Sequence, residues 1–290
     1  MTSAPFTRRS MLIGAGAAVL APAAALIAGP GLARPDPRGV SVAATSTAGE
    51  SQFSRLRCGS DGGWAVWRYS GVLVLKPEDR LAQSVCRIEG LSFNRMLRDD
   101  SGQLLYELDE VGYFCHVDTG QVLETLDNPF TGSSVEPRHY RSPQQTVLSG
   151  RRVEPAQDLP PGVDFRGEIT VLADIDPVIA MTEDLYVRVR GSAKSRNEPR
   201  ARDQIFTSLA TFTARRNELL DTQRDWVDAD LSYTTMNSFT DWLDMTDVEG
   251  IQNMRLVGRK APVGHLETVA GALLDRIQAD HPDFLDVPFA

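Results

Sequence analysis

The chain has 290 residues, enough for one large domain or two small ones, and a formal charge of −9. An acidic protein without a lysine-rich tract is a poor partner for nucleic acid or for an anionic membrane surface. Its three cysteines, Cys58, Cys86 and Cys115, fit neither a disulfide framework nor a zinc ribbon. We expect buried structural thiols, and one disulfide formed after export stays open as the alternative.

The first 33 residues have the pattern of a twin-arginine export signal. Arg8 and Arg9 precede an uncharged run from Met11 to Gly29, and Gly31-Leu32-Ala33 provides small residues for cleavage. We therefore expect the Tat translocase to export the protein to the periplasm or beyond, without a stable membrane span in the mature chain. The run is also long enough to span a membrane, so an uncleaved anchor is the alternative. Cleavage would bring the formal charge near −11.

Residues 34–52 are small and polar with several prolines, which is typical of a linker, and a single β-rich domain is expected over 53–290. Residues 64–75 are apolar at both alternating sets of positions, which predicts a strand covered on both faces. Residues 84–97 predict a second strand. Residues 103–126 predict a hairpin that turns at Asp118-Thr119-Gly120.

The second half continues this pattern after a loop-rich stretch over 127–162. Further strands are predicted at 168–175, 184–191, 204–216 and 229–239. A C-terminal amphipathic helix is predicted by an apolar stripe at helical spacing, formed by Leu266, Val269, Ala270, Leu273, Leu274 and Ile277. His281-Pro282 would end this helix.

The predicted fold is mainly β with minor α. Many antiparallel strands and one terminal helix indicate a barrel-like or strongly curved sheet that encloses a pocket. Closure would remove the long apolar edge strands. A barrel of this size usually holds one small molecule.

The sequence contains no motif for a known cofactor. HExxH, CxxC, GxSxG and the P-loop lysine motif are all missing, so no cofactor is predicted. A metal site stays open through His116 or His139 with nearby carboxylates, although Asp118 is explained more simply as a turn residue. Glu107 and Asp109 share a strand face, which is usually a solvated face.

Several motifs resemble one family. The segments "EVGYF", "DTGQVLETLDNPFTGSSVEPRHY", "LSYTTMNSFTDWLDM" and "VGRKA" resemble the signatures of DUF1838, a domain family of unknown function in bacteria and fungi, many of whose bacterial members carry twin-arginine signals. The resemblance spans roughly residues 53–285 and implies no reaction. The chain departs from the family pattern at Phe130, where Tyr is common, and at Leu126, where Trp is common. Carried over, the motif positions are Tyr113, Asp118, Gly120, Asn128, Pro129, Thr131, Gly132, His139, Glu183, Asp184, Tyr233, Trp242, Gly258, Arg259 and Lys260.

Five of the ionisable or phenolic residues are candidates for catalysis: His139, Arg259, Tyr113, Tyr233 and Glu183. His139 would act as general base or acid, and Arg259 with Tyr113 or Tyr233 would stabilise an oxyanion. The alternatives are a hydrogen-bonded structural histidine and a surface arginine. Adjacent strand residues point to opposite faces, so only one of each pair Arg259-Lys260 and Glu183-Asp184 can enter a lumen.

The candidate substrate-binding residues are Asn128, Trp67, Tyr69, Trp242 and Lys260. The aromatic ones could line a pocket, and core packing is the alternative. The leading hypothesis is a cofactor-independent enzyme of isomerase, lyase, decarboxylase or hydratase type, acting on a small apolar or aromatic molecule. A non-catalytic lipocalin-like binding protein and a metal-dependent enzyme are the alternatives. The leading hypothesis requires His139 to share one cavity with Arg259, Glu183 or Tyr233.

Overall fold

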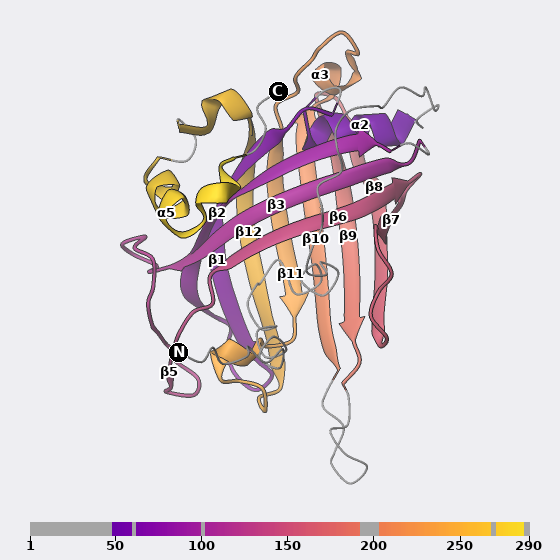
Figure 1. Ribbon diagram of the computed structural model, residues 1–290. Coiled ribbons are helices and arrows are strands. Elements are labelled where there is room, and N and C mark those ends of the chain that lie inside the picture. The colour runs from indigo at the N-terminus through magenta and orange to yellow at the C-terminus, as the bar shows by residue number, and fades with distance from the viewer. Residues whose placement is uncertain (1–47, 60–61, 100–101, 192–202, 268–270, 287–290) are drawn as a thin grey trace, which may run out of the picture.

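The computed structural model describes residues 48–59, 62–99, 102–191, 203–267 and 271–286, so the expected signal peptide lies outside the described residues. Ten antiparallel strands form a closed barrel in the order β1-β12-β11-β10-β9-β8-β7-β6-β3-β2 (Figure 1). The strands are β1 (Ala65–Pro77), β2 (Gln83–Arg98), β3 (Leu104–Cys115), β6 (Tyr140–Ser149), β7 (Arg152–Pro155), β8 (Val163–Ile175), β9 (Val178–Val189), β10 (Gln204–Arg215), β11 (Asp230–Asn237) and β12 (Gly250–Pro262). This confirms the mainly β, antiparallel, barrel-like prediction.

The remaining elements are short. They are α2 (Ala48–Arg57), α3 (Arg216–Leu220), α5 (Ala272–Asp280), the 3-10 turns η2 (Asp241–Leu243), η3 (Val263–His265) and η4 (Pro282–Phe284), and the two-stranded sheet β4 (Leu126–Asp127) with β5 (Ser134–Val135). The expected linker ends inside α2, which begins at Ala48. Across the described segments, no helix combines the length and the apolar character that a membrane span requires.

The barrel closes between its first and last strands. β1 and β12 pair along their whole length, from Ala65 opposite Pro262 to Pro77 opposite Gly250. The residues that pair across this seam are far apart in the sequence, and such non-local pairing forms slowly during folding. The closing seam therefore depends on nearly the whole domain being present.

Two predictions for the middle of the chain are wrong. The hairpin expected over 103–126 has no second strand, because after the turn only Val122 bridges back to Cys115. The long partner of β3 is instead β6, within the stretch predicted to be loops. β6 contains Pro143, and a proline usually indicates that a strand is interrupted. Here Pro143 lies in the half of β6 that does not pair with β7, because that pairing begins only at Thr146. A proline is tolerated where one side of a strand has no ladder partner.

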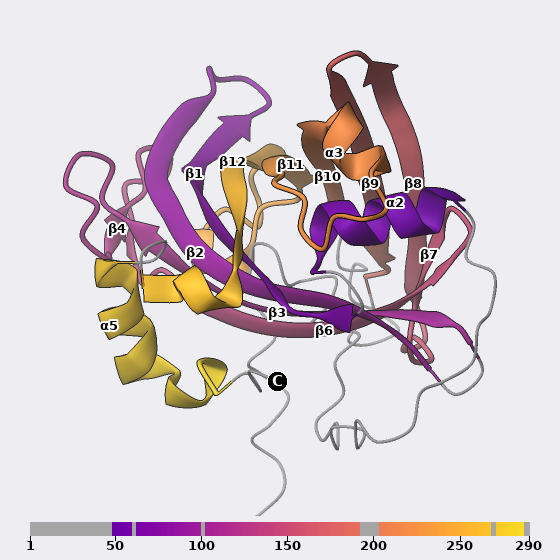
Figure 2. The ribbon, with the colours of Figure 1, turned by 90° about the horizontal axis from the view of Figure 1, so that it is seen from above.

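The predicted C-terminal helix is confirmed as α5, although positions 269 and 270 of its stripe lie outside the described residues. Leu273 and Ile277 pack with Phe284 of η4 on the outer face of β1–β3, against Val66 and Phe93. Figure 2 shows α5 beside these strands and outside the barrel. Both faces of β1 are therefore covered, as its apolar pattern indicates.

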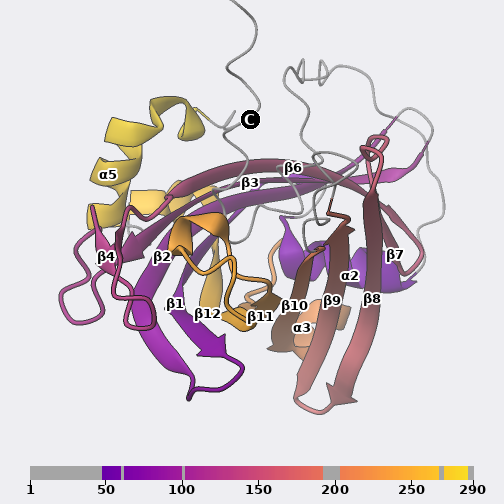
Figure 3. The same cartoon turned by 90° about the horizontal axis from the view of Figure 1, so that it is seen from below.

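Two apolar clusters close the ends of the barrel. At one end α2 inserts Phe53 and Leu56 against Phe212, with the Phe53 and Phe212 ring centroids 5.7 Å apart. At the other end the connection from β11 to β12 packs Trp242 and Leu243 into a second cluster. Figures 2 and 3 view the barrel from these two ends. All three cysteines are free and buried.

Two glycines let two tyrosine rings lie flat on the inner wall. Gly90 and Gly112 are paired across β2 and β3, with Tyr69 and Tyr140 as their outer neighbours in the same row. The two phenol oxygens meet at 3.0 Å above the glycines. A Cβ at Gly112 would overlap the Tyr140 ring.

Gly112→Ala should therefore destabilise the fold by about 1–3 kcal/mol, because the Tyr140 ring must leave its place in a packed interior. Urea unfolding at equilibrium measures this loss. Gly264→Ala is the matched control, since no atom lies within 4 Å of its added Cβ. Equal stability of the two variants would contradict the tight packing of the tyrosine pair.

Candidate functional site

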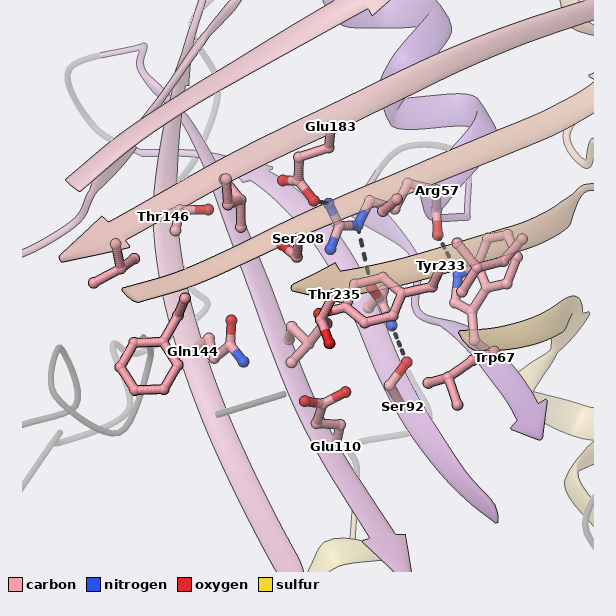
Figure 4. Close-up of a pocket in the computed structure, with 18 of the residues that line it drawn as sticks. Arg57, Trp67, Ser92, Glu110, Gln144, Thr146, Glu183, Ser208, Tyr233 and Thr235 are labelled. Carbon is pink, nitrogen blue, oxygen red and sulfur yellow. Dashed lines mark hydrogen bonds and ion pairs between the residues drawn. The ribbon is translucent and has the colours of Figure 1, made fainter. Parts of the chain in front are cut away.

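The barrel encloses a cavity of about 110 Å³ between the two apolar end clusters (Figure 4). For comparison, an engineered cavity of about 150 Å³ in another protein holds benzene, so the volume suits a molecule of one ring. Its apolar walls include Trp67, Leu108, Phe165, Phe206, Phe212 and Leu231. Its polar wall includes Ser92, Asn94, Gln144, Thr146, Ser208, Thr235 and Asn237.

Some residues that line the cavity lie close to the surface, beside the shortest strand of the barrel. β7 has four residues and pairs with β8 at only two positions, Arg152 and Val153. Beside this weak seam, the exposed Pro143 and the half-buried Gln157 line the cavity. A small molecule could enter there without opening either end cluster.

Glu110 stands at the centre of the inner wall. It lies midway along β3, between Ser92 of β2 and Ser142 of β6 in one cross-strand row. Its side chain is buried, and its Oε1 atom has no hydrogen-bond partner in the described part of the chain. Burial raises the pKa of Glu110 to about 8; the nearby charge of Arg57 opposes this rise and that of Asp109 adds to it. At neutral pH this carboxyl is mostly protonated.

Arg57 faces Glu110 across the cavity. It is the last residue of α2, and its Nη1 forms a buried ion pair with Oε2 of Glu183 on β9. Its Nε donates to Oδ1 of Asn94 at 3.4 Å, and its Cζ lies 3.9 Å from the Tyr106 ring centroid. Burial opposes the charge of Arg57, but Glu183 and Tyr106 outweigh it and raise the pKa of the guanidinium.

The third nitrogen of Arg57, Nη2, makes no hydrogen bond to the described residues. Figure 4 shows the guanidinium between the Glu183 carboxylate and the open part of the cavity. The other two nitrogens are occupied, so Nη2 is the atom of Arg57 that a ligand could use. Arginine fits planar oxygen acceptors through such fixed donors.

A hydrogen-bond network holds the polar wall around these two groups. Asn94 accepts from Tyr106 and donates from Nδ2 to Ser92 Oγ at 2.8 Å. On the other side of Glu110, Gln144 donates to Ser142 Oγ at 3.2 Å. Because neighbouring polar groups are satisfied by one another, the unpartnered Glu110 oxygen is an exception in this wall.

Four of the sequence-predicted site residues meet at this cavity: Glu183, Tyr233, Trp67 and Tyr69. Glu183 points inward while Asp184 is exposed, as strand alternation requires. Trp67 donates from Nε1 to the Arg57 carbonyl at 2.8 Å and so anchors the end of α2. Burial, followed by the charge of Glu110, raises the pKa of Tyr233, so its phenol stays neutral.

His139 is not part of the cavity wall. Its Nδ1 accepts the Phe114 backbone N–H at 3.2 Å, and its Nε2 lies 3.1 Å from the Leu123 carbonyl. These contacts fix a neutral ring with the proton on Nε2. Burial lowers the pKa of His139, in agreement with this state. The arrangement is that of a structural histidine, and the requirement that His139 share a cavity with the other candidates is not met.

The basic pair on β12 also lies away from the cavity. Arg259 is exposed on the outer wall, and Lys260 is buried on the inner side. Lys260 donates from Nζ to the carbonyls of Arg55 at 2.7 Å and Cys58 at 3.1 Å. Its charge therefore stabilises the C-terminal end of α2, where cations are favoured. Burial lowers the pKa of Lys260 to about 8.

The other three candidate residues, Tyr113, Asn128 and Trp242, make structural contacts outside the cavity wall. Tyr113 lies on the outer face under α5, with Arg276 Cζ 5.8 Å from its ring centroid. Asn128 donates from Nδ2 to the Leu243 carbonyl at 2.7 Å and holds the end cluster to its loop. Trp242 packs in that cluster, 5.0 Å from the Phe114 ring centroid.

The described residues bring no three His, Cys, Asp or Glu side chains together in a way that could hold a metal ion. His116 uses Nδ1 to accept the backbone N–H groups of Asp118 at 3.2 Å and Thr119 at 3.4 Å. Both histidines considered for a metal therefore have backbone partners. The outward carboxylates Glu107 and Asp109 are ion-paired with Arg95 and Arg141.

The molecule is thus a closed antiparallel β-barrel with a polar, ionisable site inside its lumen. A family model described as "Protein of unknown function (DUF1838)" matches residues 64–290, and the chain belongs to this family. No curated protein and no solved structure matches the chain.

The sequence reasoning missed Glu110 and Arg57. A signal for Glu110 was present, because its positions i−2, i+2 and i+4 are Leu108, Gly112 and Phe114, an otherwise apolar face of the strand. A single acid on such a face is a candidate for a buried, perturbed group. Arg57 has no comparable signal, since its role depends on how α2 inserts into the barrel.

Proposed function

We propose that this protein is a cofactor-independent acid–base enzyme that holds a small, largely apolar molecule in the barrel lumen and exchanges a proton with it through Glu110. The single observation that carries this proposal is the buried Glu110 carboxyl, which lines the cavity, makes no hydrogen bond to the described residues and has a pKa of about 8. A proton-transfer group works best when its pKa lies near the working pH.

The roles expected of His139 and Arg259 pass to Glu110 and Arg57 in this proposal. Glu110 moves the proton, and Arg57 stabilises negative charge on the substrate. A lipocalin-like binding protein would instead need an apolar lumen without facing charges. The described lumen contains Arg57, Glu110 and Glu183, which favours catalysis over simple storage.

We also propose export by the twin-arginine route to the periplasm or beyond, on the pattern around Arg8 and Arg9. The closing seam of the barrel supports it, because β1 and β12 pair only after almost the whole domain exists. Folding before export would avoid exposed strand edges outside the cell.

The test measures deuterium uptake from D₂O by three one-ring carbon acids: cyclohexanone, phenylacetonitrile and phenylacetate. The native protein should accelerate uptake by at least one of them, and Glu110→Gln should abolish the acceleration. Asp184→Asn, on the exposed face of β9, is the matched control and should behave like the native protein. Uptake that survives in Glu110→Gln would contradict the proposed role, and binding without uptake would favour a binding protein.

The rate of this exchange should rise with pH and then level off, without a decrease at high pH. Glu110 must be ionised to accept a proton, so kcat/KM should rise about tenfold per pH unit below the pKa of about 8 and level off above it. Stopped reactions analysed by mass spectrometry between pH 6 and pH 10 give this profile. A profile that is flat across pH 8 would contradict Glu110 as the base.

A further inference from the structure

The charges inside the lumen point to a substrate class, an inference that rests on the proposed function. We infer that the substrate is an uncharged one-ring ketone, and that the reaction moves a proton at the carbon next to its carbonyl. The charge balance of the cavity, the two lining groups with unused hydrogen-bonding capacity and the atom balance of the reaction each support this inference.

The cavity wall is electrically balanced at neutral pH. Its described charged residues are Arg57 and Glu183, which neutralise each other in a buried pair, and Glu110, which is mostly protonated. Neither a carboxylate nor an ammonium ligand would find an unpaired counter-charge there, because Arg57 and Glu183 are already paired with each other. Burying an uncompensated charge is strongly unfavourable, so an uncharged ligand is favoured.

Two groups that line this space have hydrogen-bonding capacity to spare. The Glu110 carboxyl makes no hydrogen bond to the described residues, and neither does Nη2 of Arg57. A ketone satisfies both, because its oxygen accepts from Arg57 while the adjacent C–H group meets Glu110. The aromatic and aliphatic walls, including Trp67 and Phe212, contact the ring.

The reaction needs no additional reactant. The ionised Glu110 takes the proton from the α-carbon, the C–H electron pair forms the enolate double bond, and the carbonyl π pair moves onto the oxygen held by Arg57. Glu110 then returns the same proton, either to the α-carbon or, in a β,γ-unsaturated ketone, to the γ-carbon. The second outcome gives the conjugated ketone and restores the carboxylate.

The charge balance of the lumen also argues against two other classes of reaction, decarboxylation and the addition or loss of water. A decarboxylase acts on an anionic acid, which this lumen disfavours. Addition or loss of water usually requires a second free acid for the oxygen, and Glu183 is committed to Arg57. A proton shift within one uncharged molecule needs only the two groups present.

The test is the conversion of 3-cyclohexen-1-one to 2-cyclohexen-1-one by the whole protein, followed by the ultraviolet absorbance of the conjugated product. Glu110→Gln should lower kcat at least a hundredfold. Arg57→Lys keeps a cation for Glu183 but removes the donor geometry, so kcat should fall at least tenfold with a smaller change in KM. Cyclohexanone should compete for the site, and cyclohexanecarboxylate should compete at least tenfold more weakly.

Different failures have different meanings in this experiment. If cyclohexanecarboxylate competes as well as cyclohexanone, the uncharged-substrate inference is wrong. If phenylacetonitrile or phenylacetate exchanges deuterium through Glu110 but neither ketone reacts, the substrate class is wrong while the proposed function stands. If no carbon acid reacts, both are wrong. Circular dichroism of each variant confirms that a lost rate does not reflect a lost fold.

Discussion

Glu110→Gln is expected to stabilise the protein at alkaline pH and to remove the loss of stability that Glu110 causes as the pH rises to about 8. The native pKa of Glu110 is about 8 against an ordinary 4.5, so between these values the unfolded chain has lost a proton that the folded chain keeps. The contribution of Glu110 to stability is therefore largest below pH 4.5 and falls by about 5 kcal/mol as the pH rises to about 8. Gln carries no charge and avoids this loss.

Urea unfolding of both proteins at pH 6 and pH 9 measures the difference. The native protein should lose stability between these two values, and Glu110→Gln should lose much less. Glu124→Gln is the matched control, because Glu124 is exposed and its substitution leaves the barrel interior unchanged. A native protein equally stable at both values, once the control is subtracted, would show that burial does not hold the Glu110 proton.

Glu183→Gln is expected to destabilise the fold by about 3–5 kcal/mol. The variant leaves the Arg57 guanidinium buried without its counter-charge, and an unpaired buried charge is costly. The loss should be seen as a lower urea midpoint at pH 7. The neighbouring Asp184→Asn, which points outward from the same strand, should change stability by less than about 0.5 kcal/mol.

The double variant Arg57→Met with Glu183→Met separates the cost of an unpaired charge from the value of the pair. It removes both charges and keeps similar volume, so it should recover most of the stability that Glu183→Gln loses. It should also be inactive toward carbon acids, because no cation then stabilises the enolate. If the double variant is as unstable as Glu183→Gln, the ion pair itself stabilises the fold, and the cost of an unpaired buried charge is not the main effect.

Much of the barrel could be predicted because its strands are either apolar on both faces or cleanly alternating. β1 is the clearest case, since its outer face is covered by α5 and its inner face fills the lumen. β6 could not be predicted, because Pro143 and the polar residues beside it belong to a strand that lacks a ladder partner on one side. The partner of β3 was misassigned for the same reason, since a turn at Gly120 gives no information on which strand follows.

The site was harder to predict because its residues look ordinary in sequence. Glu107, Asp109 and Glu110 form one acidic stretch, and the pair that shares a face is the outward one. Only the barrel register shows that Glu110 faces inward between Ser92 and Ser142. His139 is the opposite example: it lies in a motif and was a candidate for catalysis, but both of its ring nitrogens contact backbone groups. The chemical roles could be anticipated, but the residues that supply them depend on non-local pairing.

The most direct test of the central claim is the pKa of Glu110, measured by carbon NMR on protein labelled at the glutamate side-chain carboxyl carbon. The resonance that disappears in Glu110→Gln identifies the group. We expect this resonance to titrate with a midpoint of about 8, far above the ordinary value of 4.5. A midpoint near 4.5 would mean that the carboxyl is ionised and solvated at neutral pH, which contradicts both the buried free oxygen and the proposed acid–base function.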